Sequence, residues 1–186
     1  MELFGNYLRK NIPAWKKLVE NELKVDLGTI DILPLPKCID EIIEELHPSL
    51  CKKILFKLIG MPLIYLSEDF IAAKAGKSTV YYSRSPLVAI GSERDMTQTA
   101  LHELGHIAHR KLLEPFGHED YHKIPENVRE GFAECVAIYL IQKLNMPPNI
   151  NSRYYKSYRN LAVGRHGLKD IIDDVLVLYS PASLKV

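Results

Sequence analysis

Cysteine is scarce in this sequence, and its spacing argues against both a disulfide framework and a cysteine-based zinc site. The 186 residues contain three cysteines, Cys38, Cys51 and Cys135. A disulfide framework needs an even set, and a thiolate zinc site needs closely spaced pairs. Neither pattern is present, so we expect reduced thiols and a cytoplasmic protein.

Long apolar runs and a surplus of charge of one sign are also missing. No run approaches the roughly 18 apolar residues of a membrane span, and the first residues lack the pattern of a secretory signal. Lysine and arginine number 24 against 23 acidic residues, a net charge of +1 with histidine neutral. We therefore expect neither a membrane nor a nucleic-acid partner. The composition, 47% hydrophobic and 25% charged, is typical of a globular domain.

Apolar spacing divides the chain near residue 60. Before that point it predicts helices over 14–23, 39–46 and 51–59, with Pro34 and Pro36 as breaks. We expect this N-terminal helical segment, residues 1–60, to form a packing layer. It covers a domain at 61–186, either as a separate segment or as part of one compact unit.

Short strands precede long helices after residue 60. Strands are predicted at 62–66, 78–82 and 87–90, where β-branched, aromatic and apolar residues gather. Helices are predicted at 95–111, 126–144 and 152–175, the first two joined by a polar loop over 115–125. The pattern indicates an α+β fold, with a small, mostly antiparallel sheet followed by two long helices and then C-terminal helices.

The helix predicted at 95–111 carries the sequence TALHELGHIAHR. In it His102, Glu103 and His106 form an H-E-x-x-H pattern. Because four residues make just over one helical turn, both imidazoles project from one face, about 6 Å apart along the axis, and can bind one ion. Glu103 can then activate a metal-bound water as general base. The alternative is an amphipathic helix whose histidines are exposed or hydrogen-bonded.

A catalytic zinc ion (Zn²⁺) needs a third protein ligand. His109 shares the helical face of His102, but seven residues rise about 10.5 Å, too far for one ion. We expect His109 to be a partly exposed helix residue instead. The sequence NVREGFAECVAIYL offers Glu130 and Glu134, four residues apart on one face of the second helix.

Glu130 is the better candidate for the third ligand, and Glu134 for its support. Glu134 lies one turn further on and can accept the free ring N–H of a zinc-bound histidine. Apolar neighbours predict that this helix is largely buried, and buried carboxylates need partners. The alternative is a pair of solvated glutamates on a helix surface.

These motifs resemble those of the gluzincin metallopeptidases, the clan that includes thermolysin and the zinc aminopeptidases. HELGH is similar to the first zinc helix of the clan, and EGFAE to the start of its glutamate-bearing helix. The resemblance covers roughly residues 62–145 and implies that Glu130 is the ligand, with Glu134 at the place of a second acid. In size the chain is similar to minimal gluzincins (minigluzincins). The Gly-Ala-Met-Glu-Asn motif of the aminopeptidases is absent, so we expect an endopeptidase acting on peptides or proteins.

The resemblance also implies a donor for the charge that develops on the scissile carbonyl oxygen. In the family a Tyr or His beyond the glutamate helix supplies it. Our first choices are Tyr158, in the middle of a predicted helix, and His166, flanked by glycines. His118 and His122 in the connecting loop are alternatives, and so is packing of the tyrosines against the core. The stretch SRYYKSYRNLAVGRHG offers four candidates: Tyr154, Tyr155, Tyr158 and His166.

Other functions stay open at this point. In the family an edge strand in the place of 87–90 pairs with an extended peptide, although an interior strand is the alternative. A metallopeptidase-like regulator or zymogen-like form with one specific partner is a second hypothesis. A non-catalytic metal-binding module is a third, which the intact Glu103 disfavours because a structural site does not need that carboxylate.

Overall fold

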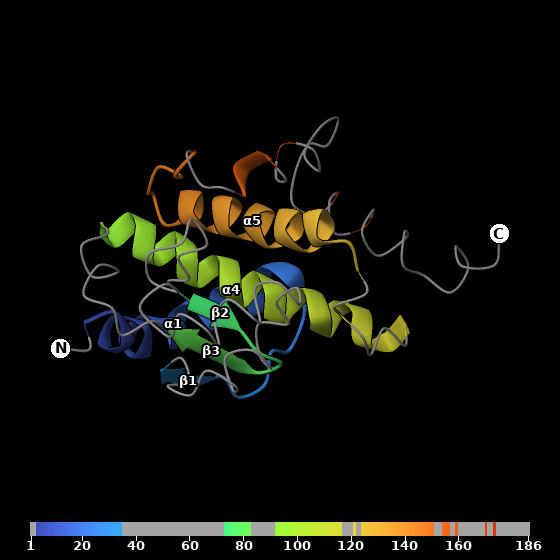
Figure 1. Cartoon of the computed structure of the whole chain (residues 1–186), viewed down its shortest axis with the longest axis horizontal. Helices are drawn as coiled ribbons and strands as arrows, with labels where there is room; N and C mark the ends of the chain where they lie inside the picture. Colours follow the sequence, from blue (N-terminus) through green and yellow to red (C-terminus); the bar gives the residue numbers. More distant parts are fainter. Residues whose placement is uncertain are drawn as a thin grey trace, which may run out of the picture.

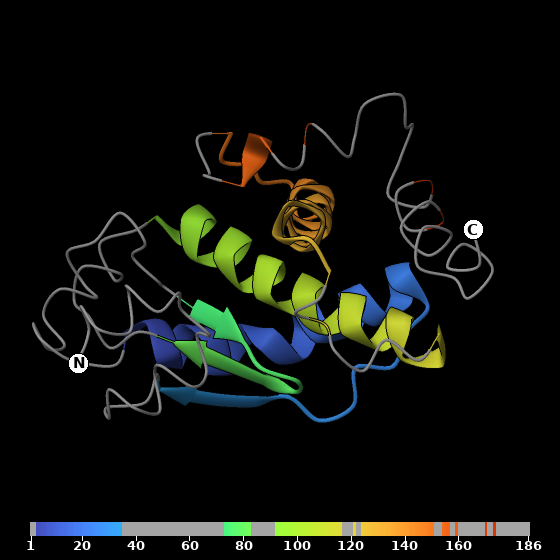
Figure 2. The ribbon, with the colours of Figure 1, turned by 45° about the vertical axis from the view of Figure 1, so that its right-hand side comes forward.

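The helix α4 (Glu93–Leu113) lies at the centre of the fold. The computed structural model describes residues 3–34, 73–82, 92–116, 121, 124–150, 154–156, 159, 170 and 173. Within these, α4 packs between α5 (Glu126–Lys143) and a small sheet, as Figures 1 and 2 show. The predicted α+β class is confirmed.

Within the described residues the sheet has three strands, in the order β1-β3-β2. The strands β2 (Ala73–Ala75) and β3 (Thr79–Tyr82) form an antiparallel pair, and Gly76 N–H donates to the Thr79 carbonyl across the turn. The strand β1 (Asp31–Pro34) pairs with the other edge of β3 in parallel. The sheet is therefore mixed.

The prediction of a mostly antiparallel sheet is wrong for the described strands, because one of the two pairings is parallel. Two described strands were missing from the prediction, β1 and β2. At β1 the sequence indicated only a chain break at Pro34. Proline is tolerated at the end of an edge strand, where its lack of an N–H breaks no ladder bond. The predicted strand at 78–82 matches β3, whereas the strands predicted at 62–66 and 87–90 lie outside the described residues.

The helix α1 (Leu3–Leu23) begins much earlier than the predicted 14–23. Its interior Pro13, which has no N–H to donate along the helix, lies on the exposed side of α1. One side of the helix joins the same hydrophobic core as α4, α5 and the sheet. The buried residues recur every three or four positions: Phe4, Leu8, Ile12, Trp15, Val19 and Leu23. The helices predicted at 39–46 and 51–59 lie outside the described residues.

The two long helices match the predicted 95–111 and 126–144 within two residues at each end. At the start of α4, Ser92 Oγ accepts a hydrogen bond from Asp95 N–H at 3.2 Å, which satisfies one of the free donors of the first turn. Arg110 and Lys111 in the last turn complement the helix dipole. Of the described helices, none is long and apolar enough to cross a membrane.

Candidate metal centre

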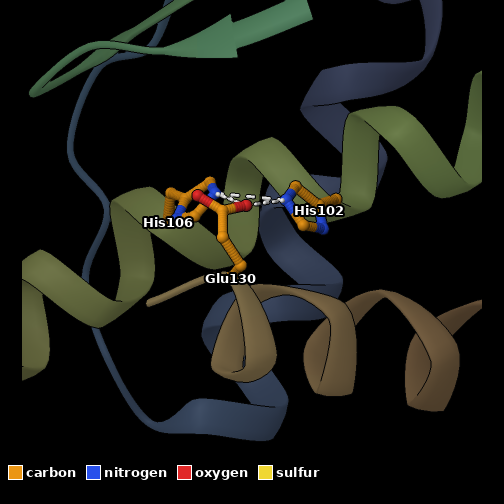
Figure 3. A group of neighbouring side chains, drawn as sticks. All are labelled: His102, His106 and Glu130. Carbon is orange, nitrogen blue, oxygen red and sulfur yellow. Dashed lines mark hydrogen bonds and ion pairs between the residues drawn. The ribbon is translucent and has the colours of Figure 1, made fainter. Parts of the chain in front are cut away.

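The helices α4 and α5 bring His102, His106 and Glu130 together, as Figure 3 shows. His102 Nε2 lies 3.1 Å from His106 Nε2 and 3.1 Å from Glu130 Oε2. The third side of this triangle, from His106 Nε2 to Glu130 Oε2, measures 3.3 Å. Two imidazole nitrogens and one carboxylate oxygen thus converge on a single point.

The triangle fits a metal ion. Tetrahedral coordination with bonds of about 2.0–2.1 Å places neighbouring ligand atoms about 3.3–3.4 Å apart, and the observed separations fall within a few tenths of that. Zinc enzymes use two histidines and a glutamate in this way and keep the fourth position open. These three residues could therefore hold one metal ion.

A close crossing of the two helices puts Glu130 within reach of the histidines. Gly105 lies on α4 between the two histidines, and a Cβ atom there would come 2.9 Å from Ala133 Cα and 3.0 Å from its carbonyl oxygen. Both distances are shorter than normal van der Waals contact. The absence of a side chain at Gly105 is therefore what allows α5 to approach.

The carboxylate of Glu134 contacts the ring nitrogen of His102 that faces away from the ligand triangle. His102 Nδ1 lies 2.8 Å from Glu134 Oε2, and Glu134 is 1% exposed. Gln98 donates to the other oxygen of Glu134 at 2.8 Å and accepts from the backbone N–H of Asn149 at 2.7 Å. We call these three residues the Glu134–Gln98–Asn149 chain. Through these hydrogen bonds the ring of His102 is connected to Asn149, in the segment that follows α5.

A neutral pair supports His106. Its Nδ1 lies 3.0 Å from the hydroxyl of Tyr121, which also lies 3.1 Å from His109 Nδ1. We call these residues the Tyr121–His109 pair. His109 is fully buried, so the expectation that it is partly exposed is wrong. It stacks on Phe132 with 4.3 Å between ring centroids, and this contact with α5 removes it from water.

Two arginines hold the ring of Tyr121 in the link between the helices. Arg110 Cζ lies 4.5 Å from the ring centroid and Arg129 Cζ 5.6 Å, so both cations face the aromatic ring. Arg110 also donates to the carbonyl of Gly76, next to β2, and Arg129 to the carbonyl of Ile124. Both arginine contacts restrict the position of the Tyr121 ring and therefore of its hydroxyl.

Burial and hydrogen bonding have opposite effects on the pKa values of the ionisable groups in the site. Burial lowers the pKa of His102, but hydrogen bonds with Glu130 and Glu134 and the nearby charge of Glu103 raise it to about 10. Burial raises the pKa of Glu130, but hydrogen bonds with His102 and His106 hold it well below its usual range. Both directions favour a charged pair, the imidazolium of His102 and the carboxylate of Glu130. Burial also lowers the pKa of His109 to about 3, so this residue is neutral.

Glu103 and Tyr154 lie next to the same histidine. The side chain of Glu103 is 7% exposed, and its charge acts on His102. The ring of Tyr154 stacks on that of His102 with 4.5 Å between centroids and 21° between planes. Tyr155 is half-buried. Tyr158 and His166 lie outside the described residues, as do His118 and His122.

Sequence reasoning missed three residues of the site: Gln98, Tyr121 and Asn149. A signal for Gln98 existed, because it precedes His102 by the same four residues that separate the two histidines. Tyr121 and Asn149 lie outside the long helices, where no periodicity shows which way a side chain points. No protein-family model, curated protein or solved structure matches this chain. The functional argument therefore rests on the geometry of these residues.

Proposed function

We propose that the protein is a zinc-dependent endopeptidase that cleaves peptides or proteins, with His102, His106 and Glu130 as the metal ligands. The observation that carries the proposal is the ligand triangle of 3.1, 3.1 and 3.3 Å with a buried carboxylate, Glu103, beside it. A structural site closes all four metal positions with protein ligands, whereas a hydrolytic site keeps one position for water.

In the proposed reaction Glu103 is the general base. A bound zinc ion supplies Lewis acidity, which lowers the pKa of a coordinated water and polarises a carbonyl oxygen. Glu103 removes a proton from the attacking water, whose oxygen forms a bond with the carbonyl carbon of the substrate. Glu103 then passes this proton to the amide nitrogen as the C–N bond breaks, which yields a carboxylic acid and an amine.

Among the described residues, Tyr154 is our choice of donor for the charge on the carbonyl oxygen. It belongs to the aromatic stretch predicted for this role, and it lies against His102. Tyr158 and His166 stay alternatives from the same stretch. A Tyr154→Phe variant that binds zinc normally and loses catalytic rate supports Tyr154, and one with full rate assigns the donor to another residue.

Zinc is our choice among the metals that the three ligands fit. Two histidines and one carboxylate also bind Fe²⁺ in oxygenases. We favour zinc because peptide hydrolysis needs no redox chemistry and because a general base stands beside the ligands. Elemental analysis of the purified protein distinguishes zinc from iron directly.

The test combines metal content with hydrolysis. The protein is purified, its metal content is measured, and cleavage of a mixed peptide library is followed by mass spectrometry. Glu103→Gln should keep the metal and lose cleavage, while Glu126→Gln, at an exposed position of α5, serves as the matched control. Cleavage that survives in Glu103→Gln contradicts the role of this residue. Bound metal without cleavage of any peptide or protein favours the regulator or the non-catalytic module instead.

A further inference from the structure

The Tyr121 hydroxyl lies between two imidazole nitrogens of α4. It is 3.0 Å from His106 Nδ1 and 3.1 Å from His109 Nδ1. Tyr121 is 5% exposed and His109 0%, so these hydrogen bonds form away from bulk water. The Tyr121 hydroxyl thus contacts a proposed metal ligand, His106, and a second histidine, His109, that has no role in the proposed reaction.

Metal binding fixes the direction of the first hydrogen bond. If His106 uses the lone pair of Nε2 for the ion, its ring proton is on Nδ1. His106 Nδ1–H then donates to the oxygen of Tyr121. This step rests on the proposed metal centre.

The second hydrogen bond offers an acceptor for the Tyr121 hydroxyl proton. If Tyr121 donates to Nδ1 of His109, the proton of the neutral His109 ring is on Nε2. In the described part of the chain His109 Nε2 is buried with no hydrogen-bond partner. A leucine or phenylalanine would fill this position beside Phe132 without leaving a buried nitrogen unpaired. Packing alone therefore does not account for a histidine, whereas an acceptor for Tyr121 does.

We propose that Tyr121 is a positioning residue for the metal ligand His106, and that His109 orients the Tyr121 hydroxyl for this purpose. The pair fixes the Nδ1–H tautomer and the ring orientation of His106. It does so without adding charge to a site that already holds the carboxylates of Glu103, Glu130 and Glu134. Three carboxylates already exceed the charge of one divalent cation, so a fourth anion would add to an excess of negative charge.

The experiment compares zinc affinity in four proteins by competition with a chromophoric chelator. Tyr121→Phe should bind zinc about 10–100-fold more weakly than wild type, the usual effect of losing a partner behind a ligand. His109→Leu should also weaken binding, because it removes the acceptor. His109→Asn should bind near the wild-type level, because its side-chain oxygen can take the place of Nδ1.

A second readout separates positioning from general stability. With Co²⁺ in place of zinc, the visible absorption of Tyr121→Phe should differ from wild type, and the metal-free unfolding temperature is recorded for each variant. A purely structural role would change the unfolding temperature and leave the Co²⁺ spectrum and the zinc affinity as in wild type, which would overturn the proposal. Weak zinc binding by His109→Asn equal to that of His109→Leu would overturn the role of His109.

Nuclear magnetic resonance of the zinc-loaded wild-type protein tests the same assignment without any substitution. The ¹⁵N shifts should show His106 protonated on Nδ1 and His109 on Nε2, and a His109 proton on Nδ1 would contradict the proposal. If wild type binds no metal at all, the proposed function fails together with this inference. If it binds zinc and Tyr121→Phe is indistinguishable from it, this inference alone fails.

Discussion

The two histidines of the triangle are one helical turn apart, yet the protein supports them in different ways. Behind His102 lies a carboxylate, Glu134, held by Gln98. Behind His106 lies the neutral Tyr121–His109 pair. A carboxylate makes an imidazole a more basic ligand, while a hydroxyl mainly orients it. We therefore expect Glu134 to tune the charge of the site and the Tyr121–His109 pair to set its geometry.

Removal of the Glu130 carboxylate should lower zinc affinity more than any other change, because this group completes the ligand triangle with both histidines. Glu130→Ala should lower zinc affinity by more than the roughly 10–100-fold expected for a supporting residue. Chelator competition measures the loss, with Glu126→Ala at an exposed site of the same helix as control. Wild-type affinity in Glu130→Ala would mean that the ligand set is wrong.

Gly105 lies between the two supported histidines, so a change there tests whether both depend on the same helix crossing. In Gly105→Ala the new methyl group meets the backbone of Ala133, which cannot yield as a flexible side chain would. Overpacking costs about 1–3 kcal/mol, against a gain of about 1 kcal/mol in helix propensity. We expect weaker zinc binding and no net gain in the free energy of unfolding, measured with urea on the metal-free protein. A more stable variant with normal zinc affinity would show that the helices can separate freely.

Glu134→Gln makes the support of His102 as neutral as that of His106. Hydrogen bonds to charged groups are roughly twice as strong as neutral ones, so the loss of zinc affinity should fall in the upper part of the 10–100-fold range and exceed that of Tyr121→Phe. The two variants are compared in one chelator titration. Equal losses would remove the proposed difference between the supports.

Proton release on zinc binding should be the smallest of these effects, but it reports on a single group, His102. His102 has a pKa of about 10 in the metal-free protein, raised against burial by Glu130, Glu134 and Glu103, so it carries a proton at pH 8 that zinc must displace. Calorimetry in buffers of different ionisation enthalpy should detect about one proton released per zinc from His102. Release of none would contradict the imidazolium–carboxylate pair.

The raised pKa of His102 also makes the free energy of unfolding of the metal-free protein depend on pH. The unfolded pKa is 6.5, so the stabilisation from His102 is complete below that pH and is lost as pH rises through about 10. We expect the free energy of unfolding to fall over this interval. In Glu134→Gln, where one raising partner is gone, the fall should be smaller.

The sequence predicted the elements whose signals are local. An i, i+4 spacing on one helix places His102 and His106 on one face, and the two long helices were bounded within two residues. Pairing between distant segments left no such signal, so the parallel strand β1 was missed. The burial of His109 was also missed, because it depends on Phe132 from α5. The support of His106 could not be predicted for a similar reason, since Tyr121 comes from a connecting segment.

The buried side of α1 has a practical consequence for work with fragments. Its six apolar side chains share a core with α4 and α5, the two helices that carry the ligands. A fragment beginning at residue 61 would leave that surface of α4 open to water. We expect such a fragment to aggregate or to lose its fixed helix spacing, so the shortest version that can be used for spectroscopy must retain Leu3–Leu23.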